Sequence, residues 1–221
     1  MPAVRVHVSL GVVTSEGATE LVRLRDGSSV TVRAATARDE PALLSFLNGL
    51  CLEARRMRFF TGAADIPYAA HLAAATGADR YGLIAHDEAG LTVAHATYVK
   101  LDEQRAEVAV EVADHLHGRG LGTTLIERLA AVAEARGITS FVAEVLPDNS
   151  AMLDVFRDGF DAQLHLHDGT DTAEFPTAAW RLAHERFAQT PDDLAQTPDG
   201  SAKTPDGGLS LSDVDAGPRA S

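Results

Sequence analysis

Residues 112–123 read Val112-Ala113-Asp114-His115-Leu116-His117-Gly118-Arg119-Gly120-Leu121-Gly122-Thr123, a glycine-rich junction between two segments of regular pattern. The segment before it, 106–112, alternates valine with other residues as a strand does, whereas the leucines after it recur at helical spacing as far as Val132. Glycines let a backbone approach a ligand closely, and the first amides of a helix point outward unpaired. The junction is therefore suited to bind a pyrophosphate.

The glycine spacing of this junction also suggests a dinucleotide-binding βαβ unit. Three segments before the junction favour a different arrangement. They alternate apolar and polar side chains between short turns, at 81–86, 91–101 and 106–112, which is typical of an antiparallel meander. Because a dinucleotide-binding fold begins with parallel strands, the meander argues against it.

Patterns elsewhere in the chain predict the other elements. These are a strand at 30–33 after a turn at 25–28, a helix from Thr36 to Leu50, a helix at 67–75, a strand at 138–145, a helix at 151–157, and two strands around the Asp168-Gly169 turn. Residues 52–66 fit no pattern. The order of elements predicts a mixed α/β fold in which helices flank a central, mostly antiparallel mixed sheet.

One domain is expected, because 221 residues with 45% hydrophobic side chains suffice for a single filled core. We assign this domain to residues 21–188, after an arm of unassigned order at 1–20. In residues 189–221 the triplet Thr-Pro-Asp occurs three times, and recurring proline with few apolar side chains excludes a coiled-coil seam. This acidic segment is predicted to be a disordered tail.

The composition argues against several classes of protein. A formal net charge of −13 disfavours binding to nucleic acid, which needs a basic surface. No apolar run reaches membrane-spanning length and the first twenty residues lack a signal-peptide pattern, so we expect a soluble cytoplasmic protein with no membrane partner. Cys51 is the single cysteine, so we expect no thiolate metal cluster, and we predict a small buried side chain at this position.

The nine histidines include two His-x-His pairs, 115/117 and 165/167. Such pairs can place two metal ligands on one face of a strand. A metal site needs three or four ligands, and no spacing of Asp, Glu or His supplies the others. We therefore expect no metal.

The junction resembles the motif Gln/Arg-x-x-Gly-x-Gly/Ala, with which N-acetyltransferases of the GNAT superfamily bind the pyrophosphate of coenzyme A. The resemblance implies acetyl-CoA as the co-substrate, bound largely through backbone amides. Val112 would offer backbone groups to the pantetheine and the thioester. The other implied cofactor-binding residues are His117, in the Gln/Arg position, and Gly118, Arg119, Gly120, Leu121, Gly122 and Thr123.

A second segment, 146–160, resembles the helix of this family that meets the pantetheine arm, with Asn149 at its start. Many GNAT enzymes carry a tyrosine seven residues after this asparagine as the general acid for the leaving thiolate. Here that position is Phe156, and counting back from Gly159 selects Val155 instead. Neither side chain can donate a proton, so the general acid is water or an unassigned group.

Two glutamates on the strand before the junction are candidate catalytic bases. An amine acceptor must lose a proton before it attacks a thioester, and a carboxylate can accept that proton directly or through water. In protein-acetylating GNAT enzymes, a glutamate followed by apolar residues has this role, which points to Glu107. Glu111, nearer the expected thioester, is the second candidate. A solvated strand-face carboxylate is the alternative for Glu107.

Segments 24–27, 50–60 and 174–176 are similar to the GNAT domains of bacterial Pat-type protein lysine acetyltransferases. The likeness implies acetyl transfer to a primary amine, with a protein lysine favoured over a small-molecule amine. It also implies that Arg55, Arg58 and Phe59 help to shape the acceptor side, although packing or surface roles explain them equally well. A non-catalytic acyl-CoA-binding or regulatory module is the alternative, because the tyrosine is missing. No pattern indicates an oligomeric state.

Overall fold

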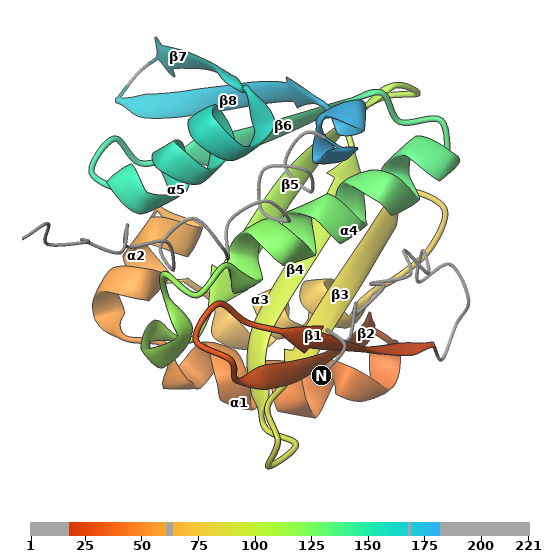
Figure 1. The fold of residues 1–221 in the computed structure, drawn as a ribbon, viewed down its shortest axis with the longest axis vertical. Coiled ribbons are helices and arrows are strands. Elements are labelled where there is room, and N and C mark those ends of the chain that lie inside the picture. Colours follow the sequence, from red (N-terminus) through yellow and green to blue (C-terminus); the bar gives the residue numbers. More distant parts are fainter. Residues whose placement is uncertain (1–17, 61–63, 168, 182–221) are drawn as a thin grey trace, which may run out of the picture. The chain divides into compact units, whose positions relative to one another are not determined.

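The computed structural model describes residues 18–60, 64–167 and 169–181. The expected tail at 189–221 and nearly all of the expected arm at 1–20 lie outside these residues. The described chain forms a central sheet with helices on both faces (Figure 1). The predicted fold class, a mixed α/β architecture around a mostly antiparallel sheet, is confirmed.

Eight strands form the sheet, in the order β1-β2-β3-β4-β5-β6-β8-β7. The strands are β1 Thr19–Arg23, β2 Ser29–Ala34, β3 Arg80–His86, β4 Thr92–Lys100, β5 Arg105–Val112, β6 Ser140–Val145, β7 Gln163–His167 and β8 Thr170–Pro176. All neighbours are antiparallel except β5 and β6, which run parallel. Parallel neighbours need a crossover connection, and the chain between β5 and β6 supplies one in the form of a helix.

That crossover helix, α4, covers one face of the sheet, and α1 and α3 cover the other (Figure 1). The helices are α1 Glu40–Gly49, α2 Leu52–Phe59, α3 Ile66–Ala74, α4 Leu121–Ala135 and α5 Ser150–Asp154, the last continued by a π-helical turn at Val155–Gly159. The predicted leucine stripe of α4 is buried in one cluster with Tyr98 and Val108, whereas α1 packs with Ile84 of β3. Alternate residues of a strand point to opposite faces of the sheet. Buried apolar side chains of the strands occur in both clusters, so both faces of the sheet are apolar.

Three expectations about the local structure were wrong or incomplete. The first strand begins at Thr19, two residues before the predicted domain start, and α2 occupies part of the segment that fitted no pattern. Cys51 is exposed, not buried, and stands at the N-cap of α2. Its Sγ accepts a hydrogen bond from the Ala54 amide at 3.3 Å, so the side chain caps the helix instead of packing into the core.

Glu127 of α4 is a carboxyl group in a mostly apolar layer. Glu127 is 7% exposed, and burial raises its pKa from the ordinary value of 4.5 to about 7. The charge of Arg128, whose guanidinium lies 3.9 Å from the carboxylate, acts to lower this pKa. The folded protein therefore holds this proton more tightly than the unfolded chain does. It follows that Glu127 lowers the free energy of unfolding progressively as the pH rises from 4.5, its pKa in the unfolded chain, to about 7.

We expect Glu127→Gln to stabilise the protein at pH 8 and to have less effect at pH 5. The full penalty corresponds to about 3 kcal/mol, since each pKa unit is worth about 1.4 kcal/mol. Urea unfolding at the two pH values measures the difference. Glu88→Gln, at an exposed turn between β3 and β4, is the control and should change stability little at either pH. Equal stability of Glu127→Gln and the native sequence at pH 8 would contradict the prediction.

Candidate active site

The strands β5 and β6 part from each other in the middle of the sheet. Their parallel pairing joins residues 105–107 to residues 140–142, and no register extends it. On its other edge β5 pairs with β4 along 106–112. Within the described residues, the β6-facing edge of 108–112 is therefore left without a strand partner. We call this unpaired stretch between β5 and β6 the wedge; its closed, paired end lies at Glu107.

The glycine-rich junction lies where β5 leads into α4, as the sequence predicts. Gly118 and Gly120 have φ angles of +73° and +87°, values that favour glycine. The amide of Thr124 donates to the Gly120 carbonyl at 3.0 Å, so the amides of 121–123 precede this first helical hydrogen bond. These amides can bind an anion, as can the positive end of the helix dipole.

The side chains of this turn of α4 point into the protein. Leu121 is 1% exposed and Thr123 is 5% exposed. A Cβ atom at Gly122 would lie 3.8 Å from Cγ2 of Val112, so this glycine packs beside the end of β5. The predicted contacts of these three residues can therefore come from their backbone amides.

His117 joins the junction to the end of β5. Its Nε2 lies 2.9 Å from the carbonyl oxygen of Val112 and donates to it, because a carbonyl only accepts hydrogen bonds. The residue in the Gln/Arg position of the motif thus fixes the start of the loop. The Val112 carbonyl, which was expected to face the pantetheine, already accepts this bond.

The tip of the β1–β2 hairpin lies against the junction. The amide of Arg25 donates to the carbonyl of Arg119 at 3.2 Å. The guanidinium of Arg119 donates to the carboxylate of Asp26, which also accepts from the hydroxyl and the amide of Ser28. The hydrogen bonds from Ser28, with the charge of Arg119, lower the pKa of Asp26. The side chain of Arg119, one of the expected cofactor-binding residues, is therefore directed to Asp26.

The two candidate bases are in different surroundings on the same face of β5. Glu107 is exposed, at the last paired residue before β5 and β6 diverge. Glu111 is buried, with one oxygen 2.9 Å from Nε of Arg58 and the other 2.8 Å from Nδ1 of His95. Burial acts to raise the pKa of Glu111, but the charges and hydrogen bonds of Arg58 and His95 lower it to about 2. Glu111 is thus a fully engaged carboxylate.

His95 is a buried member of this site that the sequence analysis missed. It is fully buried on β4, with Nδ1 toward Glu111 and Nε2 3.2 Å from the carbonyl oxygen of Ala73 in α3. Both neighbours accept hydrogen bonds, so both are satisfied when each ring nitrogen carries a proton. A histidine within the apolar run Val93-Ala94-His95-Ala96 was the available signal, because a buried polar side chain needs partners.

Comparison with known proteins identifies the family of this chain. The family model described as Acetyltransferase (GNAT) family matches residues 51–160. The crystal structure of the GNAT domain of S. lividans PAT is 34% identical and superposes with a TM-score of 0.65, covering 72% of this chain and 96% of that domain. The chain belongs to the GNAT family.

Two other solved structures share the GNAT fold at lower identity. A cAMP-binding acyltransferase from Mycobacterium smegmatis is 23% identical, with a TM-score of 0.52 over 72% of this chain and 47% of that one. The spermidine N-acetyltransferase from Vibrio cholerae, solved in complex with CoA and spermine, is 15% identical, with a TM-score of 0.53 over 69% of this chain and 98% of that one. The described chain is thus comparable to about half of the mycobacterial protein.

The helix after β6 departs from the usual GNAT pattern, as the sequence predicts. Asn149 stands at its N-cap, and its side-chain oxygen accepts from the Met152 amide at 3.2 Å. Phe156 is 2% exposed and packs against Phe175 with ring centroids 5.3 Å apart. Val155 begins the π-helical turn. Neither Val155 nor Phe156 offers a proton, so this helix supplies no general acid from those positions.

Helix α2 of this GNAT chain has three arginines with separate partners. Arg55 donates to the carbonyls of Leu50 and Asn48, which end α1, so its role there is structural. Arg58 bonds to Glu111 and lies 5.1 Å from the ring centroid of Phe59. Arg56 forms ion pairs with Glu53 and, at 2.6 Å, with Asp148 beyond β6. The helix is thus tied to both sides of the wedge.

Among the described residues, no group of three or more His, Cys, Asp or Glu side chains is arranged to hold a metal ion. In the same part of the chain, every helix is too short or too polar to cross a membrane.

Proposed function

We propose that this GNAT protein transfers an acetyl group from acetyl-CoA to a primary amine, with Glu107 as the general base. The observation that carries the proposal is the position of Glu107: an exposed carboxylate at the closed end of the wedge between β5 and β6. An amine that reaches this end from solvent would meet a proton acceptor beside the open edge of β5.

The described residues fit the cofactor that the family uses. The amides of 121–123 and the left-handed glycines of the junction suit a pyrophosphate. Apart from the Val112 carbonyl, which accepts from His117, the open edge of 108–112 carries backbone groups that can pair with the amides of a pantetheine arm. Asn149 stands beyond β6, at the start of α5. Acetyl-CoA would supply a thioester, an acyl group activated for attack by nitrogen.

Starting from an alkylammonium, the reaction removes two protons from nitrogen and adds one to sulfur. An alkylammonium is unreactive, so Glu107 would accept its first proton directly or through water. The amine nitrogen then bonds to the acyl carbon, the carbon–sulfur bond breaks with its electron pair on sulfur, and the nitrogen releases its second proton to water. Because Val155 and Phe156 cannot protonate the thiolate, water is the proposed acid.

The surroundings of Glu111 favour Glu107 over it as the base. A carboxylate whose pKa is held at about 2 by Arg58 and His95 is a weak proton acceptor, and both of its oxygens already accept hydrogen bonds. A general base works best when its pKa lies near the working pH. We assign Glu111 a structural role in holding α2 and β4 to the catalytic strand.

A protein lysine is the acceptor that we favour. The support is the 34% identity to the GNAT domain of S. lividans PAT, together with the segments that resemble Pat-type lysine acetyltransferases. The proposal also includes a cytoplasmic location and a GNAT domain that spans about residues 21–188. A small amine is the second candidate, since the Vibrio cholerae structure in complex with CoA and spermine shares the fold.

A thiol-release assay tests the proposal. The full chain is incubated with acetyl-CoA and a panel of lysine peptides, folded proteins and small amines, and free CoA is measured over time. Turnover on lysine peptides or proteins above that on small amines is expected. Turnover on small amines alone would identify a small amine, and not a protein lysine, as the acceptor. Tight CoA binding without turnover on any acceptor would instead support a non-catalytic acyl-CoA-binding module.

A further inference from the structure

We propose that Arg25, from the β1–β2 hairpin, is the side-chain cation that binds the pyrophosphate of coenzyme A, in place of Arg119 from the motif. The inference rests on the proposed binding of the cofactor at the glycine-rich junction. It adds to the site a residue that lies more than ninety positions before the motif and outside it.

The first support is the engagement of Arg119. Its guanidinium donates to Asp26, whose carboxylate also accepts from the Ser28 hydroxyl at 2.6 Å and the Ser28 amide at 3.0 Å. Asp26 is thus fixed within its own turn and directs the Arg119 side chain to the hairpin. Arg119 then holds the hairpin against the loop.

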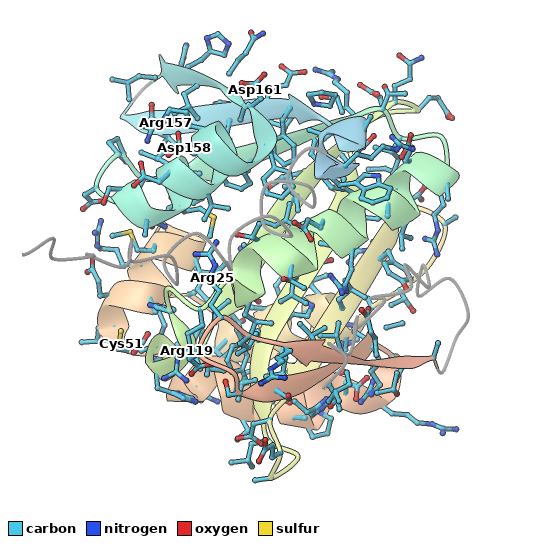
Figure 2. All side chains as sticks on the ribbon, viewed as in Figure 1. Arg25, Cys51, Arg119, Arg157, Asp158 and Asp161 are labelled. Atoms are coloured by element: carbon cyan, nitrogen blue, oxygen red, sulfur yellow. The ribbon has the colours of Figure 1, made fainter. Side chains whose placement is uncertain are left out.

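The second support is the position of the Arg25 side chain. A Cβ atom built on Gly120 would lie 3.3 Å from Nε of Arg25 and 3.7 Å from its Cγ and Cδ. The side chain therefore lies along the backbone of Gly120, where the φ of +87° already favours glycine. Arg25 and Arg119 lie near each other at the amino end of α4, with the Arg25 amide bonded to the Arg119 carbonyl (Figure 2).

The third support is electrostatic. The guanidinium of Arg25 and the positive end of the α4 dipole both attract anions, and they approach each other at Gly120. In a chain of formal charge −13, an anion is otherwise repelled. A guanidinium can also bond two phosphate oxygens at once. The hairpin thus brings a phosphate-binding group to the place where the helix amides point outward.

Calorimetric titration of the full chain with CoA tests the role of Arg25. Arg25→Gln should weaken binding about 10- to 100-fold, the usual value of hydrogen bonds to a charged group. Arg119→Gln should weaken it less. Arg23→Gln, on the same hairpin and exposed, is the matched control and should stay within about twofold of the native affinity. Arg25→Lys should recover part of the loss, and circular dichroism checks folding.

Two further titrations separate the possible failures. Gly120→Glu places bulk and negative charge in the loop, and it should remove most of the affinity. If it does so while Arg25→Gln binds CoA normally, the Arg25 proposal is overturned and the loop assignment stands. If Gly120→Glu also binds normally, the loop assignment itself fails. With 3′-dephospho-CoA, Arg25→Gln should weaken binding by the same factor as with CoA. If the variant binds 3′-dephospho-CoA as tightly as the native protein does, Arg25 contacts the 3′-phosphate and the pyrophosphate contact is overturned.

Discussion

Glu107→Gln is expected to lower the rate of acetyl transfer by about 10²- to 10⁴-fold, the usual contribution of a general base. Glutamine keeps the shape of the side chain but cannot take a proton from the acceptor amine. Because Glu107 lies on β5 and not in the glycine-rich loop, the affinity for CoA should stay unchanged. Thiol release on the best acceptor measures the rate, and calorimetry measures the affinity.

The control for this prediction is Glu103→Gln, an exposed glutamate in the turn that precedes β5, which should keep native activity. A loss of rate together with a loss of CoA affinity would indicate a damaged site. A rate within about threefold of the native value would make Glu107 a solvated strand-face carboxylate, because removal of a general base costs at least about a hundredfold.

Glu111→Ala is expected to destabilise the fold by about 3–5 kcal/mol, because it leaves the Arg58 guanidinium and the buried His95 ring without the carboxylate that both contact. Such a loss is a large part of the total stability of about 5–15 kcal/mol of a native protein. Urea unfolding at pH 7 measures it. Glu107→Ala, on the same face of the same strand but exposed, is the matched control and should cost less than about 0.5 kcal/mol.

The pH dependence of this effect has a definite sign. The pKa of Glu111 is lowered from 4.5 to about 2, so the ionised carboxylate stabilises the fold above about 4.5 and this contribution is lost as the pH falls toward 2. The difference in stability between the native protein and Glu111→Ala should therefore narrow in acid. A difference below about 1 kcal/mol at pH 7 would refute the buried network as a structural element, since breaking such a pair normally costs several times more.

The parts of the fold that the sequence predicted are those whose signals are local. The strand at 106–112, the junction and the leucine stripe of α4 follow from alternation, glycine and helical spacing within thirty residues. The segment that became α2 was not recognised, because half of its eight residues are charged and none is buried. Cys51 was misjudged because an N-cap position depends on where that unrecognised helix begins.

The parts of the site that the sequence did not predict depend on contacts between distant residues. Glu111 and Arg58 are 53 positions apart, and no spacing rule joins them or adds His95. Glu111 could be named as a carboxylate on the correct strand, but its low pKa follows from partners that only the folded chain assembles. The approach of Arg25 to Gly120 is of the same kind, since a hairpin tip carries no sequence signal for what it packs against.

The wedge between β5 and β6 also bears on how the protein avoids self-association. An unpaired strand edge is normally a template for aggregation, and proteins protect such edges with charges, bulges or covering segments. Here the open edge of 108–112 lies inside the sheet, with β6 joined to the same strand at 105–107. A strand from another molecule would have to enter a gap that is closed at one end. A thin, flexible ligand arm can thus reach the backbone hydrogen-bonding groups of this edge, whereas a strand of a neighbouring polypeptide cannot.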